Sequence, residues 1–118
     1  MFIISNNYQD THMSDQIQAS HILVSHAEAY NASSKLTKVE AQKCIEDLKS
    51  KLISGSDFSA VAAECSDCPS AEKGGDLGMF GRGAMVEAFD TAAFGLEVGE
   101  ISDVVETEFG YHLIYRTT

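Results

Sequence analysis

Two cysteines, Cys65 and Cys68, have the C-x-x-C spacing found in many metal and redox sites. With His21 and His112 they could complete a Cys₂His₂ set for structural zinc. A second C-x-x-C is absent from the sequence, which weakens this assignment. Cys65 also falls on the apolar stripe of a predicted helix, where a small buried hydrophobe is expected. A zinc-binding domain is therefore an alternative that a metal analysis would settle.

Redox and phosphate chemistry fit the same region less well. A thioredoxin-like C-x-x-C opens a long helix after a buried strand, whereas this pair follows a predicted helix. The glycine-rich stretch "GGDLGMFGRG", residues 74–83, contains neither G-x-x-x-x-G-K-[ST] nor G-x-G-x-x-G. Its aromatic bulk also stands where a phosphate cradle needs bare backbone. Neither a redox cofactor nor a nucleotide is expected.

The two histidines stand inside apolar, strand-like runs, "IQASHILV" and "YHLIY". Burial favours the neutral imidazole ring, which donates a hydrogen bond from one nitrogen and accepts at the other. A lone histidine is more often structural than catalytic. Two such histidines could hold each other and neighbouring side chains in a fixed hydrogen-bond network.

Strands and helices of an α+β domain must position these residues. Residues 17–24 read as a strand, with Ala19, His21 and Leu23 on one face. A helix is predicted from the T-x-x-E capping box of Thr37 to Gly55, and a shorter helix from the Asp57 cap. The remaining expected elements are a short strand in "DLGMF", a helix in "MVEAFDTAAFG" and a hairpin in "ISDVVETEFGYHLIYRT" with its turn at 108–110.

Length and charge narrow the classes of function. The 118 residues suit one domain, residues 16–118, after a loose N-terminal tail at 1–15. A net charge of −10 argues against binding to nucleic acid or to an anionic membrane. The sequence contains no run of about 20 apolar residues, so no transmembrane span is expected. The odd number of cysteines, three, favours a reducing cytoplasm over a disulfide framework.

Three segments in this order resemble the parvulins, which are peptidyl-prolyl cis/trans isomerases: "ASHILV", "SDCPSAEKGGDLGMFGRGAMVEAF" and "GEISDVVETEFGYHLIYR". The resemblance runs from about Ile17 to Thr117. It implies a parvulin-like fold of the FKBP-like superfold: a four-stranded antiparallel sheet wrapped by about four helices, in β-α-α-α-β-α-β-β order. The fourth helix would be the short "PSAEK" segment after Cys68.

The resemblance also assigns roles to residues that the pattern alone would leave as core. His21 and His112 match the paired active-site histidines, and Thr107 matches a hydroxyl in their network. Cys68 matches a position that carries Cys in some members and Asp in others, which favours a non-covalent role. The expected proline pocket consists of Leu77, Met85 and Phe89, with Phe80 supporting its wall. No metal or cofactor is implied.

The expected function is isomerisation of Xaa-Pro bonds in proline-containing polypeptides by a monomeric folding enzyme. Phosphorylation-directed parvulins carry a basic cluster in the loop after the first strand. Here that loop offers only His26, Lys35 and Lys38, so no phospho-Ser/Thr requirement is expected. Phe109 at the hairpin turn favours apolar residues before proline. The alternative is a non-catalytic, peptide-binding chaperone module.

Overall fold

A computed structural model describes residues 16–30, 32 and 34–118. The predicted loose tail, 1–15, lies outside the described residues. The elements follow in this order: β1 (Gln16–Val24), α1 (Lys38–Ile53), α2 (Phe58–Cys65), the 3-10 helix η3 (Pro69–Lys73), β2 (Asp76–Gly81), α3 (Glu87–Phe94), β3 (Val105–Thr107) and β4 (Gly110–Arg116). The expected α+β order is confirmed, with η3 in the third helical position. Among the described residues the third helical element is thus a 3-10 helix, and the other three helical elements are α-helices.

The four strands form one antiparallel sheet in the order β2-β1-β4-β3. β1 and β4 are the two central strands, and they pair over six residues. In this register His21 lies opposite Ile114, and Leu23 lies opposite His112. The two histidines are therefore diagonal neighbours on one face of the sheet, within reach of each other.

Local sequence signals set the ends of the helices. The Thr37 side chain accepts from the Glu40 backbone N–H at 3.1 Å, and the Glu40 carboxylate accepts from the Thr37 N–H at 2.8 Å. This is the predicted capping box. Asp57 caps α2 by accepting from the Ala60 N–H. The 3-10 helix has Pro69 at its start and ends at Gly74, whose backbone is left-handed.

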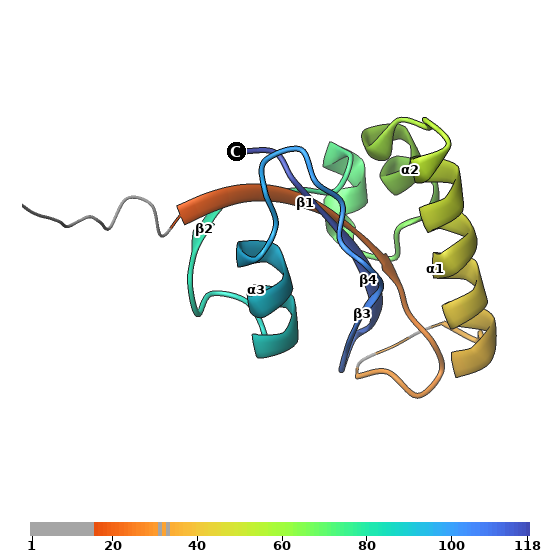
Figure 1. The fold of residues 1–118 in the computed structure, drawn as a ribbon. Helices are drawn as coiled ribbons and strands as arrows, with labels where there is room; N and C mark the ends of the chain where they lie inside the picture. The colour runs from red at the N-terminus through yellow and green to blue at the C-terminus, as the bar shows by residue number, and fades with distance from the viewer. Residues whose placement is uncertain (1–15, 31, 33) are drawn as a thin grey trace, which may run out of the picture.

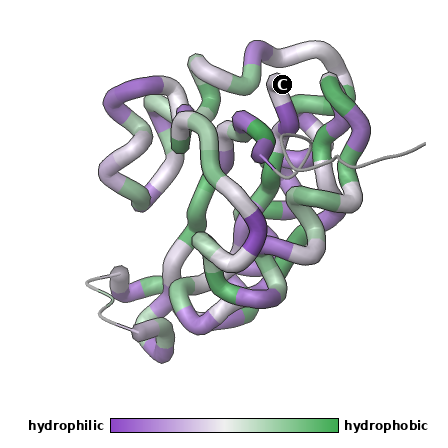
Figure 2. The backbone as a smooth tube through the Cα atoms, turned by 90° about the vertical axis from the view of Figure 1, so that its left-hand side faces the viewer, coloured by the Kyte–Doolittle hydropathy of each residue, from purple (hydrophilic) through white to green (hydrophobic). Residues whose placement is uncertain are grey.

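The sheet lies between two helical layers. α1 and α2 cover one face, and α3 covers the other (Figure 1). Ile22 and Leu113 belong to the cluster beneath α1 and α2, whereas Ile17 and Ile114 belong to the cluster beneath α3. Figure 2 shows hydrophobic and hydrophilic residues alternating along the chain, as expected for elements with one buried side. None of the described helices is both long and apolar enough to cross a membrane.

Two glycines allow the backbone to pass close to the central strands. Gly75 has φ +87°, and a Cβ there would overlap the His21 carbonyl oxygen. Its own carbonyl accepts the His21 N–H at 2.9 Å. Gly110 has φ +133°, and a Cβ would lie 2.5 Å from the Val24 carbonyl oxygen. Both glycines thus let a neighbouring segment lie close to β1, Gly75 at His21 and Gly110 at Val24.

Candidate active site

The two buried histidines contact each other through one nitrogen of each ring. His21 Nδ1 and His112 Nδ1 are 3.1 Å apart, and the rings stack with centroids 5.3 Å apart and planes 20° apart. Only 6% of His21 and 4% of His112 is exposed. One ring must donate and the other accept across this contact, so the two rings cannot both be protonated.

Thr107 extends this contact into a chain of hydrogen bonds. Its Oγ1 lies 2.7 Å from His112 Nε2 and also accepts the Phe109 N–H at 3.2 Å. The hydroxyl can donate to His112 or accept from it, and the tautomer of each ring follows from that choice. The predicted network of His21, His112 and Thr107 is thus present in the geometry.

Burial keeps both rings neutral. Removal from water lowers the pKa of His21 from 6.5 to about 4. The pKa of His112 is lowered to about 3, chiefly by burial and further by the nearby His21 ring. At neutral pH the pair therefore offers hydrogen bonds without carrying charge.

Phe89 and an unpartnered nitrogen complete the surroundings of the pair. The Phe89 ring meets both histidine rings edge-on, with centroids 5.4 Å from His21 and 5.3 Å from His112. His21 Nε2 is buried and has no hydrogen-bond partner among the described residues. A buried polar atom without a partner is costly, which makes this nitrogen a candidate for contact with a ligand.

A cavity of about 390 Å³ opens over the histidines. Its walls are largely apolar, and the sequence-predicted residues that line it are His21, Cys68, Leu77, Met85, Phe89 and His112. The other two predicted residues lie behind this surface. Thr107 reaches the cavity only through His112, and Phe80 packs on Phe89 with ring centroids 6.4 Å apart.

Three further residues, Ala84, Val86 and Phe109, also line the cavity. Ala84 and Val86 flank Met85 in the segment that enters α3. Their position next to a predicted pocket residue is the sequence signal that points to them. The sequence placed Phe109 at the hairpin turn without assigning it to the pocket. Only the pairing of β3 with β4 brings that turn over the histidines.

Hydrogen bonds to β1 position Cys68. The Asp67 N–H donates to the Leu23 carbonyl at 2.7 Å, and the Leu23 N–H donates to Ser66 Oγ at 3.0 Å. The segment before η3 thus runs against β1, and Cys68 comes beside His21 in the cavity wall. The Ser70 hydroxyl donates to Cys68 Sγ at 3.2 Å.

The C-x-x-C pair does not act as one unit in this fold. Cys65 packs against the cluster beneath α1 and α2, as does Cys44, and both are partly buried. Cys68 instead lines the cavity on the histidine side. Within the described ranges, no three His, Cys, Asp or Glu side chains gather as a metal site would require. The geometry therefore gives the zinc alternative no support.

Comparisons with known proteins agree with this site. Residues 21–118 match a family model described as "Rotamase: PPIC-type PPIASE domain". Peptidyl-prolyl cis-trans isomerase Pin1 from Arabidopsis thaliana is 40% identical over 114 residues, which cover 87% of this chain and 96% of that protein. The structure of peptidyl-prolyl isomerase ESS1 from Candida albicans aligns with a TM-score of 0.87 and 32% identity, over 91% of this chain and 65% of that chain.

A longer relative is matched over part of its length. Foldase protein PrsA from Geobacillus kaustophilus is 46% identical over 103 residues, which cover 86% of this chain but 31% of that protein. The chain belongs to the PPIC-type, or parvulin, family of peptidyl-prolyl isomerases. It is accordingly an enzyme that acts on proline-containing peptides, as the sequence resemblance implied.

Proposed function

We propose that residues 16–118 form a catalytic domain that isomerises Xaa-Pro bonds without requiring a phosphorylated residue before proline. The observation that carries this proposal is the cavity, which joins an apolar wall to a neutral histidine pair. Leu77, Met85 and Phe89 hold the proline ring, and Phe80 supports Phe89 from behind. His21, His112 and Thr107 set the polarity beneath the rotating carbonyl.

The reaction breaks no covalent bond. Rotation removes only the partial double-bond character of the amide C–N bond. Rotation about C–N has a barrier of about 18–20 kcal/mol because the planar amide is stabilised by resonance. A largely apolar cavity disfavours the charge-separated resonance form and thus the planar ground state. Each 1.4 kcal/mol or so of preferential binding to the twisted state accelerates rotation about tenfold.

The buried, unpartnered His21 Nε2 is the nitrogen of the pair that we assign to contact with the peptide. In the twisted state the proline nitrogen becomes pyramidal and gains a lone pair, while the carbonyl keeps its oxygen acceptor. A neutral imidazole nitrogen can donate to either atom or accept from a backbone N–H of the peptide. Thr107 acts one step away, because its hydrogen bond to His112 is coupled to the His112 tautomer and, through the contact between the rings, to the His21 tautomer.

Cys68 stands beside this carbonyl as a polar, polarisable group. Its thiol accepts a hydrogen bond from Ser70. Rotation requires no acyl transfer, so an electrostatic contact is sufficient for this position.

The contacts of the loop after β1 support independence from phosphate. Capture of a phosphate normally uses several Arg or Lys side chains. Here His26 is buried and its Nδ1 accepts the Glu28 N–H, while Lys38 pairs with Glu106 at 2.9 Å. The space next to the cavity has Asp67 in its wall, and none of its described lining residues is Lys or Arg. A carboxylate there repels phosphate.

A matched peptide series tests the proposal. The rates of cis/trans exchange are measured for peptides that differ only at the residue before proline, with Leu, Ser, phosphoserine and Glu. We expect Leu-Pro and Ser-Pro to be turned over and phosphoserine-Pro to be no better than Ser-Pro. A strong preference for phosphoserine would overturn the proposal.

Two expectations about context belong to this proposal. The domain acts as a monomer, because the cavity is complete within one chain. The three cysteines are free, which fits a reducing compartment such as the cytoplasm. Size-exclusion chromatography with light scattering tests the first expectation, and fractionation of the source cells tests the second.

A further inference from the structure

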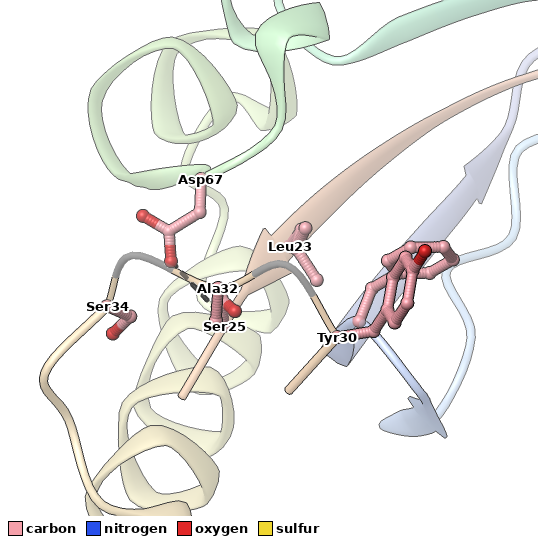
Figure 3. Close-up of a pocket in the computed structure, with 7 residues that line it drawn as sticks. Leu23, Ser25, Tyr30, Ala32, Ser34 and Asp67 are labelled. Atoms are coloured by element: carbon pink, nitrogen blue, oxygen red, sulfur yellow. Dashed lines mark hydrogen bonds between the residues drawn. The ribbon is translucent and has the colours of Figure 1, made fainter. Parts of the chain in front are cut away.

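A second pocket, of about 400 Å³, lies next to the histidine cavity. Figure 3 draws the residues that line it. Its lining includes Leu23, Ser25, Tyr30, Asp67 and Phe109. Phe109 lines both spaces. The proline chemistry described above does not use this second pocket.

Besides the hairpin turn with Phe109, two further segments line both pockets. On β1, His21 lines the first and Leu23 the second, and alternate residues of a strand are roughly 7 Å apart on the same face. After α2, Cys68 lines the first and Asp67 the second. The second pocket is therefore within reach of a residue adjacent to a proline held in the first.

An aromatic pair forms one side of the second pocket. Tyr30 and Phe109 meet edge to face with centroids 6.0 Å apart, and 60% of Tyr30 and 36% of Phe109 is exposed. The Tyr30 N–H donates to the Glu108 carbonyl at 2.7 Å, which ties the loop after β1 to the hairpin turn. The pair thus offers ring faces to a ligand from a fixed position.

A carboxylate stands across from these rings. Asp67 is exposed, and one of its oxygens, Oδ2, accepts the Ser25 N–H at 2.8 Å, the contact drawn in Figure 3. This hydrogen bond orients the carboxylate and leaves acceptor capacity on the other oxygen. Leu23 adds an apolar surface between the rings and the carboxylate.

We infer that this pocket binds a lysine or arginine side chain at the residue before the substrate proline. The inference rests on the proposed function and names its substrate class. An aliphatic stem lies along Leu23 and Phe109, as long cationic side chains do on apolar surfaces, while the cationic end reaches Asp67. The ring faces of Tyr30 and Phe109 also attract a cation.

The position before proline follows from the reaction. Rotation takes place about the bond between the proline nitrogen and the carbonyl carbon of the preceding residue. Holding the proline ring in one pocket and the preceding side chain in another grips both ends of that bond. The net charge of −10 adds a general attraction for cationic peptides.

The test compares exchange rates for peptides with Lys, its uncharged analogue norleucine (which keeps the four-carbon stem and lacks the ammonium group), or Glu before proline, and for one with Ala before and Lys after proline. We expect kcat/KM for Lys-Pro to exceed that for norleucine-Pro by about three- to tenfold at low salt. The advantage should shrink at high ionic strength. Equal rates for the two peptides, or a gain only with Lys after proline, would overturn the inference.

Asp67→Asn identifies the responsible group, because asparagine can still accept the Ser25 N–H. We expect the Lys-to-norleucine ratio to fall towards one in this variant. The matched control is Glu64→Gln, which removes the same charge from an exposed position on α2 and should keep the ratio. A ratio that survives Asp67→Asn would contradict the assignment. Turnover of norleucine-Pro shows that the proposed function stands even if the Lys preference fails.

Discussion

At the scale of single residues, the site depends on two histidines that stay uncharged. Their pKa values are lowered to about 4 and about 3, chiefly because both rings are buried. The hydrogen-bond chain from Thr107 to His21 persists as long as both rings are neutral. The activity of the pair should therefore not depend on a proton being gained or lost near neutral pH.

The first prediction concerns pH. Between about pH 6.5 and pH 4 the unfolded chain binds protons at these histidines that the folded chain does not, so stability falls as pH falls. Each histidine contributes a slope that approaches about 1.4 kcal/mol per pH unit well below pH 6.5 and is about half as large at pH 6.5. Urea unfolding at pH 6.5, 6 and 5 measures this loss of unfolding free energy. Because both rings stay neutral, kcat/KM should not change from pH 6 to 8. A free energy of unfolding that does not change from pH 6.5 to 5 would contradict the neutral pair.

The second prediction concerns Thr107. Thr107→Val keeps the shape but leaves His112 Nε2 without its partner, so the tautomers of both rings are no longer fixed. We expect kcat/KM to fall about tenfold or more, which corresponds to about 1.4 kcal/mol or more. Thr107→Ser, which keeps the hydroxyl, is the control and should retain most of the activity. Imidazole ¹⁵N shifts of His112 should change in the valine variant alone.

The third prediction concerns Cys68. Because rotation needs no covalent intermediate, Cys68→Asp should keep the activity within about tenfold while the fold is unchanged. Exchange rates on a Leu-Pro peptide, together with circular dichroism, measure both. Abolished activity in a folded Cys68→Asp protein would show that the thiol itself is required.

At the scale of the elements, short connections bring the site residues together. Gly75 lets the chain pass against His21 on its way into β2, and the segment before η3 is hydrogen bonded to β1 at Leu23. β4 carries His112 beside β1, and the short strand β3 supplies Thr107. No single element contains the site, so its geometry depends on the register of the sheet.

The fourth prediction compares two glycines with the same left-handed backbone. Gly75→Ala adds a Cβ that overlaps the His21 backbone, whereas a Cβ at Gly78, where φ is +73°, would meet nothing within 4 Å. We expect Gly78→Ala to cost about 1 kcal/mol of unfolding free energy and Gly75→Ala clearly more. Urea unfolding of both variants measures the difference. Equal losses would show that the close approach at His21 does not constrain the strand.

The elements also show what the sequence could predict. The capping box at Thr37 and the Asp57 cap are local signals, and both helices begin where predicted. Alternation predicts that His112 and Ile114 lie on the face opposite Tyr111 and Leu113. The core clusters confirm this for Ile114, and the contact with Phe89 confirms it for His112. The 3.1 Å contact between the histidines depends on the pairing register of β1 with β4, which no local pattern specifies. The pairing of β3 with β4 likewise brings Phe109 over the cavity.

In the molecule as a whole, the sheet separates the larger hydrophobic core on one face from the cavity and its histidines on the other. The larger core cluster, against which Cys65 packs, lies on the face under α1 and α2, and the face under α3 holds the histidines and the cavity over them. Family membership could be anticipated from the motifs, but the second pocket could not. Its walls come from β1, the loop after it, the Asp67 segment and the hairpin turn, which meet only in the fold.

We propose that the cavity over the histidines both binds proline and catalyses rotation. NMR exchange spectroscopy on a Leu-Pro peptide, with substoichiometric protein, tests it most directly. We predict cis/trans exchange peaks with the wild type, about tenfold slower exchange with Met85→Ala, and unchanged exchange with Met79→Ala, whose side chain is exposed outside the cavity. Peptide binding without exchange, or equal losses in the two methionine variants, would contradict the account.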